Sequence, residues 1–272
     1  MKLVTYNVHY GFGRDGINDL DRICEEIDGA DIVALQEVER NWPRSGMADQ
    51  VAAIAKRLPH HWVAYGPNLD LHSPGAFPGE VDTARRQFGN AIFSNRPILS
   101  QVNLALPRPT GRHQTMQRGA LEVVVDTKIG PVRVYCTHLD YLSPRTRSAQ
   151  LQTIADRHIN SRNGGGPWAG VHAVADEWLV GDEAAATPHA IVLGDLNIST
   201  QSSEYDRALE MLCEFVDAWH VSGNKTVGAT KDGDRIDHAF VTPAVAARLS
   251  SAWVDEAAKG SDHFPAWFGF DL

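Results

Sequence analysis

The stretch Gly260-Ser261-Asp262-His263-Phe264-Pro265 puts an acid directly beside a histidine, between a turn of small residues and a strand expected over 266–270. A second carboxylate, Asp237, ends the polar stretch Asp234-Arg235-Ile236-Asp237 upstream. A histidine held by a carboxylate is a common way to make a proton acceptor that works at neutral pH. A lone Asp-His pair at a turn is more often an ordinary surface feature, so the rest of the chain has to supply its partners.

The size and cysteine content of the chain narrow its class. It has 272 residues, of which 43% are hydrophobic, enough to bury a sizeable core in one large domain or two small ones. No apolar run is long enough to span a bilayer, and the N-terminus lacks the basic and apolar regions of a signal peptide. Cys24, Cys136 and Cys213 are an odd, scattered set without metal-ligand spacing. That pattern predicts reduced, packed thiols and a cytoplasmic protein.

The formal net charge of −9 bears on the partner. Proteins that grip duplex nucleic acid do so mostly through lysine and arginine contacts to phosphates, so an acidic chain without a basic run is a poor candidate for that role. Clustered carboxylates that hold a divalent cation also make a chain negative. The charge therefore favours small or single phosphate groups over long polyanions.

Strand-like segments outnumber helical ones, and many of them are joined by short turns. Helices are expected over about 18–28, 48–58, 146–160 and 203–212, and strands over 2–7, 31–37, 61–65, 90–94, 98–104, 119–126, 131–139, 190–194, 236–241, 251–255 and 266–270. Residues 66–89 are rich in proline and glycine and are expected to be irregular, as are 161–188. These elements suit an α+β fold with two mainly antiparallel mixed sheets packed face to face and helices outside.

Polar residues stand where several of the apolar strands end. Val132, Val134 and Cys136 alternate on one face and His138 continues their row, and Glu37 is expected to continue a core-facing row in the same way. Each such residue alone has an ordinary explanation as a cap, a turn or a satisfied core group. Together they form a much less probable set: Asn7, Glu37, His138, Asp195, Asn197, Asp237, Asp262 and His263.

This set suits metal-assisted phosphoryl chemistry. Oxygen ligands without a Cys or His cluster favour a hard cation such as Mg²⁺ or Mn²⁺. The sequence has no HExxH or CxxC motif, which disfavours a zinc peptidase or a structural zinc site. It also has no GxxxxGK[ST] motif, and Gly11-Phe12-Gly13 lacks the third glycine of a dinucleotide-binding loop.

The same residues lie in segments that resemble the successive motifs of the endonuclease/exonuclease/phosphatase superfamily of metal-dependent phosphoesterases, which includes deoxyribonucleases and neutral sphingomyelinases. The resemblance runs in order from Asn7 to His263, and it implies one catalytic domain over 1–272 with a four-layer αββα sandwich. The matching segments are Thr5-Tyr6-Asn7, Leu35-Gln36-Glu37-Val38, Gly89-Asn90-Ala91-Ile92-Phe93-Ser94, Thr137-His138-Leu139, Gly194-Asp195-Leu196-Asn197, Arg235-Ile236-Asp237 and Ser261-Asp262-His263.

The resemblance also implies a role for each matched residue. Glu37 would bind the cation, with Asn7 and Asp262 close by or acting through water, and the cation would act as a Lewis acid. His263, oriented by Asp237, would be the general base that activates water, and Asp195 would position that water or bind a second cation. Hydrogen bonds to the developing phosphoryl charge would come from Asn197 and His138. The pocket wall would include Asn90 and Arg118, with Arg118 as a bidentate phosphate contact.

The sequence-based interpretation is therefore a Mg²⁺- or Mn²⁺-dependent hydrolase that cleaves a small or exposed phosphodiester or phosphomonoester. One alternative is a nuclease acting on single-stranded or damaged nucleic acid, with Arg108, Arg112 and Arg118 as a local basic rim. Another is a catalytically silent binding protein, although every matched metal and catalytic position is present. The natural substrate, the number of cations and the choice of metal are left open, and loops 66–89 and 161–188 are expected to form the substrate rim.

Overall fold

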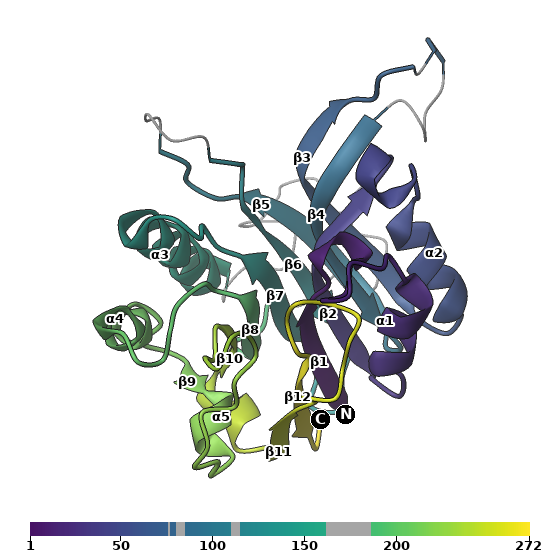
Figure 1. Ribbon diagram of the computed structural model, residues 1–272. Helices are drawn as coiled ribbons and strands as arrows, with labels where there is room; N and C mark the ends of the chain where they lie inside the picture. The colour runs from purple at the N-terminus through teal and green to yellow at the C-terminus, as the bar shows by residue number, and fades with distance from the viewer. Residues whose placement is uncertain (76, 80–84, 110–114, 162–185) are drawn as a thin grey trace, which may run out of the picture.

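Two six-stranded sheets pack face to face in the computed structural model, which describes residues 1–75, 77–79, 85–109, 115–161 and 186–272 (Figure 1). The first sheet has the strand order β11-β12-β1-β2-β4-β3, with bounds β1 Lys2–Asn7, β2 Ile32–Arg40, β3 Trp62–His72, β4 Arg85–Ser94, β11 Leu249–Val254 and β12 Ala266–Phe270. The second has the order β5-β6-β7-β8-β10-β9, with bounds β5 Ile98–Ala105, β6 Gly119–Val125, β7 Val132–His138, β8 Ala190–Asp195, β9 Val216–Asp217 and β10 Asp237–Val241. The pairs β1–β2 and β7–β8 are parallel and the other named pairs are antiparallel.

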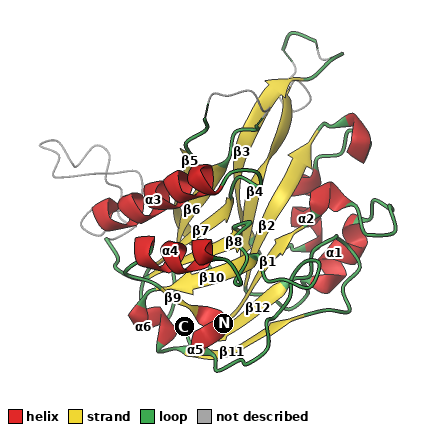
Figure 2. Ribbon diagram, turned by 60° about the vertical axis from the view of Figure 1, so that its left-hand side comes forward, coloured by secondary structure: helices red, strands yellow, loops and turns green. Residues whose placement is uncertain are grey.

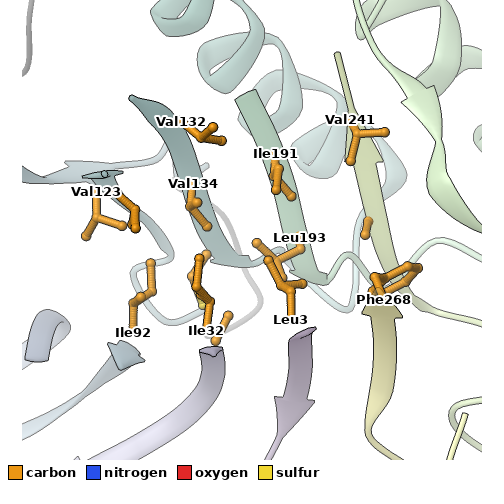
Figure 3. Close-up of a cluster of buried hydrophobic side chains, with 14 of the residues drawn as sticks. Leu3, Ile32, Ile92, Val123, Val132, Val134, Ile191, Leu193, Val241 and Phe268 are labelled. Atoms are coloured by element: carbon orange, nitrogen blue, oxygen red, sulfur yellow. The ribbon is translucent and has the colours of Figure 1, made fainter. Parts of the chain in front are cut away.

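The core between the sheets follows from strand alternation, because every second side chain points to the same face. Leu3 on β1, Ile32 on β2 and Phe268 on β12 meet Val134 on β7 and Ile191 on β8 in one fully or almost fully buried cluster (Figure 3). β-branched and aromatic residues dominate this layer, as expected where pleated surfaces interdigitate. The expected packing of two sheets is confirmed.

Helices cover the outer faces. The helices α1 (Leu20–Glu26) and α2 (Gln50–Arg57) lie on the first sheet, while α3 (Pro144–Ser161) and α4 (Ser203–Met211) lie on the second (Figures 1 and 2). Apolar side chains such as Ile23 of α1 and Leu151 of α3 fill these outer cores. The short helices are α5 (Ala218–Val221), α6 (Pro243–Ala246), η1 (His9–Gly11) and η2 (Pro43–Ser45). The four-layer sandwich with two mixed sheets is confirmed.

The prediction that residues 66–89 are irregular is wrong over much of that segment. β3 continues to His72 and β4 begins at Arg85, and His72 pairs with Arg85, so the two strands form a long hairpin arm. The prolines and glycines hid this extension, since Pro67 sits at an irregularity of the register between Pro67 and Leu69 rather than ending the strand. Residues 76 and 80–84 lie outside the described residues, as does nearly all of the expected rim loop 161–188.

Two further expectations concern cysteines and membranes. Cys24, Cys136 and Cys213 are free, with Cys24 and Cys136 buried. Within the described ranges, no helix combines the length and the hydropathy needed to cross a membrane.

Candidate active site

The polar strand ends meet because of pairing register. His138 on β7 is the partner of Asp195 on β8, and Asp195 is the partner of Asp237 on β10. Each residue lies at the end of a row that faces the other sheet: His138 follows Cys136, Asp195 follows Leu193, and Asp237 begins β10 two residues before Ala239. Two acids and a histidine on adjacent strands therefore lie side by side, at one edge of the core between the two sheets.

The β7–β8 pairing requires a glycine at position 194. Its φ is +138°, and a Cβ atom there would lie 1.9 Å from the carbonyl oxygen of Thr137. Glycine avoids this clash and tolerates the backbone angle. The Gly-Asp order of Gly194-Asp195 thus fixes where Asp195 emerges from the strand.

Asn7 joins the two sheets at this level. Its row on β1 starts at Leu3 in the interlayer core, and its side-chain amide donates to Asp195 Oδ2 (3.0 Å) and to Glu37 Oε1 (3.2 Å). Its own Oδ1 accepts from the backbone amide of His9 (3.0 Å). Asn7 is 1% exposed, so these partners replace the water that its amide would otherwise bind.

Glu37 reaches the same cleft by a different route from the one expected. Val33 and Leu35 pack against the helices of the first sheet, so simple alternation would send Glu37 to the outer face. A bulge between Leu35 and Val38 breaks the register, and Glu37 has φ +61°. The interpretation of a continuous core-facing row from Val33 to Glu37 is therefore wrong, and a strained backbone turns the carboxylate inward instead.

His263 lies against Asp237 in a buried pair. Its Nδ1 is 2.8 Å from Asp237 Oδ2, and its Nε2 is 3.7 Å from Asp195 Oδ2. Ser261 holds the turn by donating from Oγ to the carbonyl oxygen of Asn7 (2.6 Å), and His263 N donates back to Ser261 Oγ (3.3 Å). Burial by itself would lower the pKa of His263, but the charges of Asp237 and Asp195 raise it to about 9.

The two acids of the cluster differ in environment. Burial, followed by the charge of Asp237, raises the pKa of Asp195 to about 6. Hydrogen bonds from Asn7 Nδ2 and from the Asn197 backbone amide to its Oδ1 (3.0 Å) partly offset this. Asp237 Oδ1 is buried and has no hydrogen-bond partner among the described residues. An orphaned carboxylate oxygen beside a second carboxylate is an arrangement that a cation or a water would complete.

His138 sits between the two sheets and is neutral. Its Nε2 lies 3.3 Å from Asp195 Oδ2 and its Nδ1 lies 3.6 Å from Glu37 Oε1. Burial and the nearby charge of Arg118 hold its pKa well below the usual range. A neutral imidazole there can donate one N–H to an oxygen in the cleft.

The remaining expected residues divide into cleft and framework. Arg118 is 4% exposed. Burial lowers the pKa of its guanidinium, and the charges of Glu37 and Asp195 partly oppose that effect. Asn90 donates to the backbone carbonyls of Gly119 (3.0 Å) and Cys136 (3.2 Å), which ties the sheets together. Asn197, with φ +52°, donates to the carbonyl of Leu139 (3.2 Å). The amide groups of Asn90 and Asn197 are thus engaged with backbone in this state.

Lys231 is a cleft residue that the sequence analysis did not identify. Its Nζ lies 2.6 Å from Asp262 Oδ2 and 3.1 Å from His263 Nε2. Burial by itself would lower its pKa, but the hydrogen bond and charge of Asp262 raise it, so the ammonium is charged. No sequence pattern marks Lys231. The hydroxyl of its neighbour Thr230 accepts from the backbone amides of Ile236 and Asp237 (3.2 Å each) and so folds 230–237 onto the site.

Two sets of side chains could hold a divalent cation. Asp195, Asp237 and His263 offer ligand atoms within 4.8 Å of one another. Glu37 is the other centre, with Asn7 Nδ2 3.2 Å from its Oε1. Asp262 is the third expected ligand, and its carboxylate is paired with the Lys231 ammonium. Both sets are rich in carboxylate oxygens, which suits Mg²⁺ or Mn²⁺. The donor chemistry therefore fits the expected cation.

Comparison with known proteins agrees with this geometry. The sequence profile described as the Endonuclease/Exonuclease/phosphatase family matches residues 4–263. No curated protein matches the chain significantly.

Solved structures share the whole fold. An endonuclease/exonuclease/phosphatase from Beutenbergia cavernae is 25% identical, with a TM-score of 0.68 over 98% of this chain and 70% of that one. An endonuclease/exonuclease/phosphatase from Bacteroides vulgatus is 19% identical, with a TM-score of 0.70 over 100% of this chain and 98% of that one. A mannosyl-6-phosphatase from Bacteroides thetaiotaomicron is 18% identical, with a TM-score of 0.64 over 100% of both chains.

Proposed function

This chain belongs to the endonuclease/exonuclease/phosphatase family, and from that membership and its cleft we propose that it is a divalent-metal-dependent hydrolase of small or exposed phosphate esters. The observation that carries the proposal is the buried Asp237–His263 pair, 2.8 Å apart. The other ring nitrogen of His263, Nε2, faces Asp195 at 3.7 Å and Lys231 Nζ at 3.1 Å. We further propose that 1–272 acts as one catalytic domain.

His263 acts as the general base. Asp237 orients its ring, so that Nε2 takes a proton from a water molecule as the water oxygen attacks phosphorus. The bond from phosphorus to the ester oxygen breaks, and the departing oxygen takes a proton from solvent water to become an alcohol. The products are the alcohol and a phosphate monoester or inorganic phosphate. Asp195 holds the attacking water through Oδ2, the carboxylate oxygen that lies 3.7 Å from His263 Nε2.

Three side chains stabilise the charge that develops on the phosphoryl oxygens. Neutral His138 donates one N–H, and the charged groups of Lys231 and Arg118 add positive potential in a site that is largely shielded from water. Donors fixed before the reaction act strongly in such a site, where removal of one typically costs about 3 kcal/mol of transition-state stabilisation. Asn197 would join them after exchanging its backbone partner, and Asn90 would line the wall.

Glu37, Asn7 and Asp262 would hold the cation. A Mg²⁺ or Mn²⁺ ion bound there would supply Lewis-acid polarisation of the phosphoryl group. This assignment leaves His263 free as the base, whereas a cation on Asp195, Asp237 and His263 would occupy it. The strained backbone at Glu37, φ +61°, supports a functional reason for turning this carboxylate into the cleft.

The acidic chain supports a compact phosphate ester as the substrate rather than a long polyanion. The similar fold of a mannosyl-6-phosphatase is consistent with a phosphomonoester. Of the basic rim considered for a nuclease, Arg118 is buried and Arg108 is exposed, while Arg112 lies outside the described residues.

The test is hydrolysis of p-nitrophenyl phosphate and bis-p-nitrophenyl phosphate with Mg²⁺ or Mn²⁺, with and without chelator. Glu37→Ala and His263→Ala are expected to abolish turnover, while the exposed-site controls Glu25→Ala and His60→Ala retain it. Activity that survives chelator and both cleft substitutions would refute the proposal. Cleavage confined to DNA or RNA in gel assays would favour the nuclease, and absence of any turnover would favour the silent binding protein.

A further inference from the structure

A cavity of about 640 Å³ opens directly beside the catalytic groups. Tyr10, Phe12, Arg14, Arg44, Asp232 and Asp262 contribute to its walls. Asp262 belongs to both regions, because its Oδ2 accepts from Lys231 Nζ (2.6 Å) and its Oδ1 lies 4.0 Å from His263 Nε2. An ester held by the catalytic groups would therefore have this cavity next to its phosphate.

One wall is an aromatic shelf. The ring centroids of His9 and Tyr10 are 4.3 Å apart, and those of Tyr10 and Phe12 are 5.7 Å apart. His9 and Tyr10 each have φ +43°, which is unusual for residues with side chains. Gln50 and Asn18 hold this backbone by donating to the Tyr10 carbonyl oxygen (2.7 and 3.0 Å). The loop thus keeps a strained shape that presents rings at the cleft.

The charges of the cavity are mostly balanced. Arg44 donates from Nε and Nη2 to the buried carboxylate of Glu39 (3.0 and 2.8 Å), and its guanidinium lies 3.8 Å from the centroid of the Tyr10 ring. Arg14 donates to the Asp262 carbonyl oxygen (2.8 Å) and lies over the Phe264 ring (4.7 Å), contacts that do not neutralise it. Two acids, Asp232 and Asp262, also line the space. A second phosphate would gain little there, whereas a neutral ring with hydrogen-bond acceptors would fit.

Building on the proposed phosphoesterase function, we propose that this cavity binds the organic group of the substrate and selects a flat aromatic ring, as in a nucleoside 5′-monophosphate. The planes of Tyr10 and Phe12 are 64° apart, so the ring stacks on one of these side chains and packs against the edge of the other, and Arg14 donates to acceptor atoms on its edge. Aromatic shelves bind bases in this way because every base has a π face.

The test compares adenosine 5′-monophosphate with ribose 5-phosphate, since the same 5′ oxygen leaves in both. Base stacking is worth about 5- to 150-fold in affinity, so we expect kcat/KM for the nucleotide to be at least about 5-fold higher. Tyr10→Ala and Phe12→Ala should erase most of this ratio with little change for ribose 5-phosphate. Tyr10→Phe, which keeps the ring, should keep the ratio. Trp62→Ala, which removes a half-exposed aromatic at the far end of β3, should leave the ratio unchanged.

The outcomes separate this inference from the proposed function. Hydrolysis of both esters at equal kcat/KM, unaffected by Tyr10→Ala and Phe12→Ala, would overturn the ring site and leave the phosphoesterase standing. If neither ester is hydrolysed, the two p-nitrophenyl esters decide the proposed function, and calorimetric titration of adenosine 5′-monophosphate and ribose 5-phosphate decides the cavity. Tighter binding of the nucleotide that is lost in Tyr10→Ala supports the ring site, and absent or equal binding overturns it.

Discussion

Replacing Asp237 by asparagine removes a charge from the base and keeps the side-chain shape. Asp237 and His263 are each 1% exposed and are joined by a 2.8 Å contact. Burial opposes the charged imidazole, and Asp237 is the larger of two acids that raise the His263 pKa to about 9. Since the ordinary value is 6.5, the shift corresponds to roughly 3 kcal/mol in favour of the imidazolium.

The sign of the pH effect follows from that shift. A base with a raised pKa gains its reactive neutral form only as pH rises through about 9, so wild-type kcat/KM should climb across the alkaline range. Asp195 supplies part of the shift and remains in the variant. We therefore expect Asp237→Asn to move the rising limb down by about 1–2 pH units and to lower the plateau by about 10²–10⁴-fold, because the ring loses its orienting partner.

The assay is the pH profile of kcat/KM on a chromogenic phosphate ester from pH 5 to 10, together with a Mg²⁺ titration at each plateau. Asp234→Asn is the matched control, since that carboxylate caps the Arg235 backbone amide and does not touch His263. A rising limb of kcat/KM at the same pH as in wild type would refute the role of Asp237 as the group that raises the pKa of His263. Loss of cation affinity with the limb unchanged would instead assign Asp195, Asp237 and His263 to the metal.

Three other substitutions test separate parts of the site. Glu37→Gln should weaken cation binding about 10–100-fold, seen as a smaller rise in melting temperature on adding Mg²⁺ or Mn²⁺, and an unchanged rise would contradict the assigned ligand. Asp195→Asn should abolish turnover yet raise the free energy of unfolding at pH 7 by roughly 1–3 kcal/mol. The raised pKa of Asp195, about 6, favours the folded state below pH 3.8 and loses that advantage as pH rises through 6, so equal or lower stability in urea would count against it. Lys231→Ala should reduce kcat/KM for a phosphomonoester about 10–100-fold, and activity equal to wild type would show that the ammonium only neutralises Asp262.

Several site residues could be predicted from the sequence because each continues an alternating row of buried residues within a single strand. Val132, Val134 and Cys136 alternate into the interlayer core, so His138 had to follow them whatever the rest of the chain did. The same holds for Asp195 after Ile191 and Leu193. Strand period and strand end depend on a few consecutive residues, so both can be predicted from a single sequence.

Residues whose positions depend on distant partners could not be predicted in this way. Glu37 faces the cleft because of a bulge against β4, which is visible only once β2 and β4 are paired. Lys231 lies beside His263 because the hydroxyl of Thr230 accepts from the backbone amides of Ile236 and Asp237. No pattern in the neighbouring sequence indicates this contact. The β3–β4 arm was missed because its strands continue through prolines and glycines that usually end them.

By itself the sequence determined which residue types end the buried rows, how acidic the chain is and which family it resembles. Only the tertiary structure decided that Asn7 bridges the sheets to Asp195, that Lys231 occupies Asp262, and that a ring-lined cavity adjoins the cleft. The physical reason is that side-chain period is set within a strand, whereas register, bulges and loop packing are set by contacts between distant segments, as in the bond from Ser261 to Asn7, which are 254 residues apart.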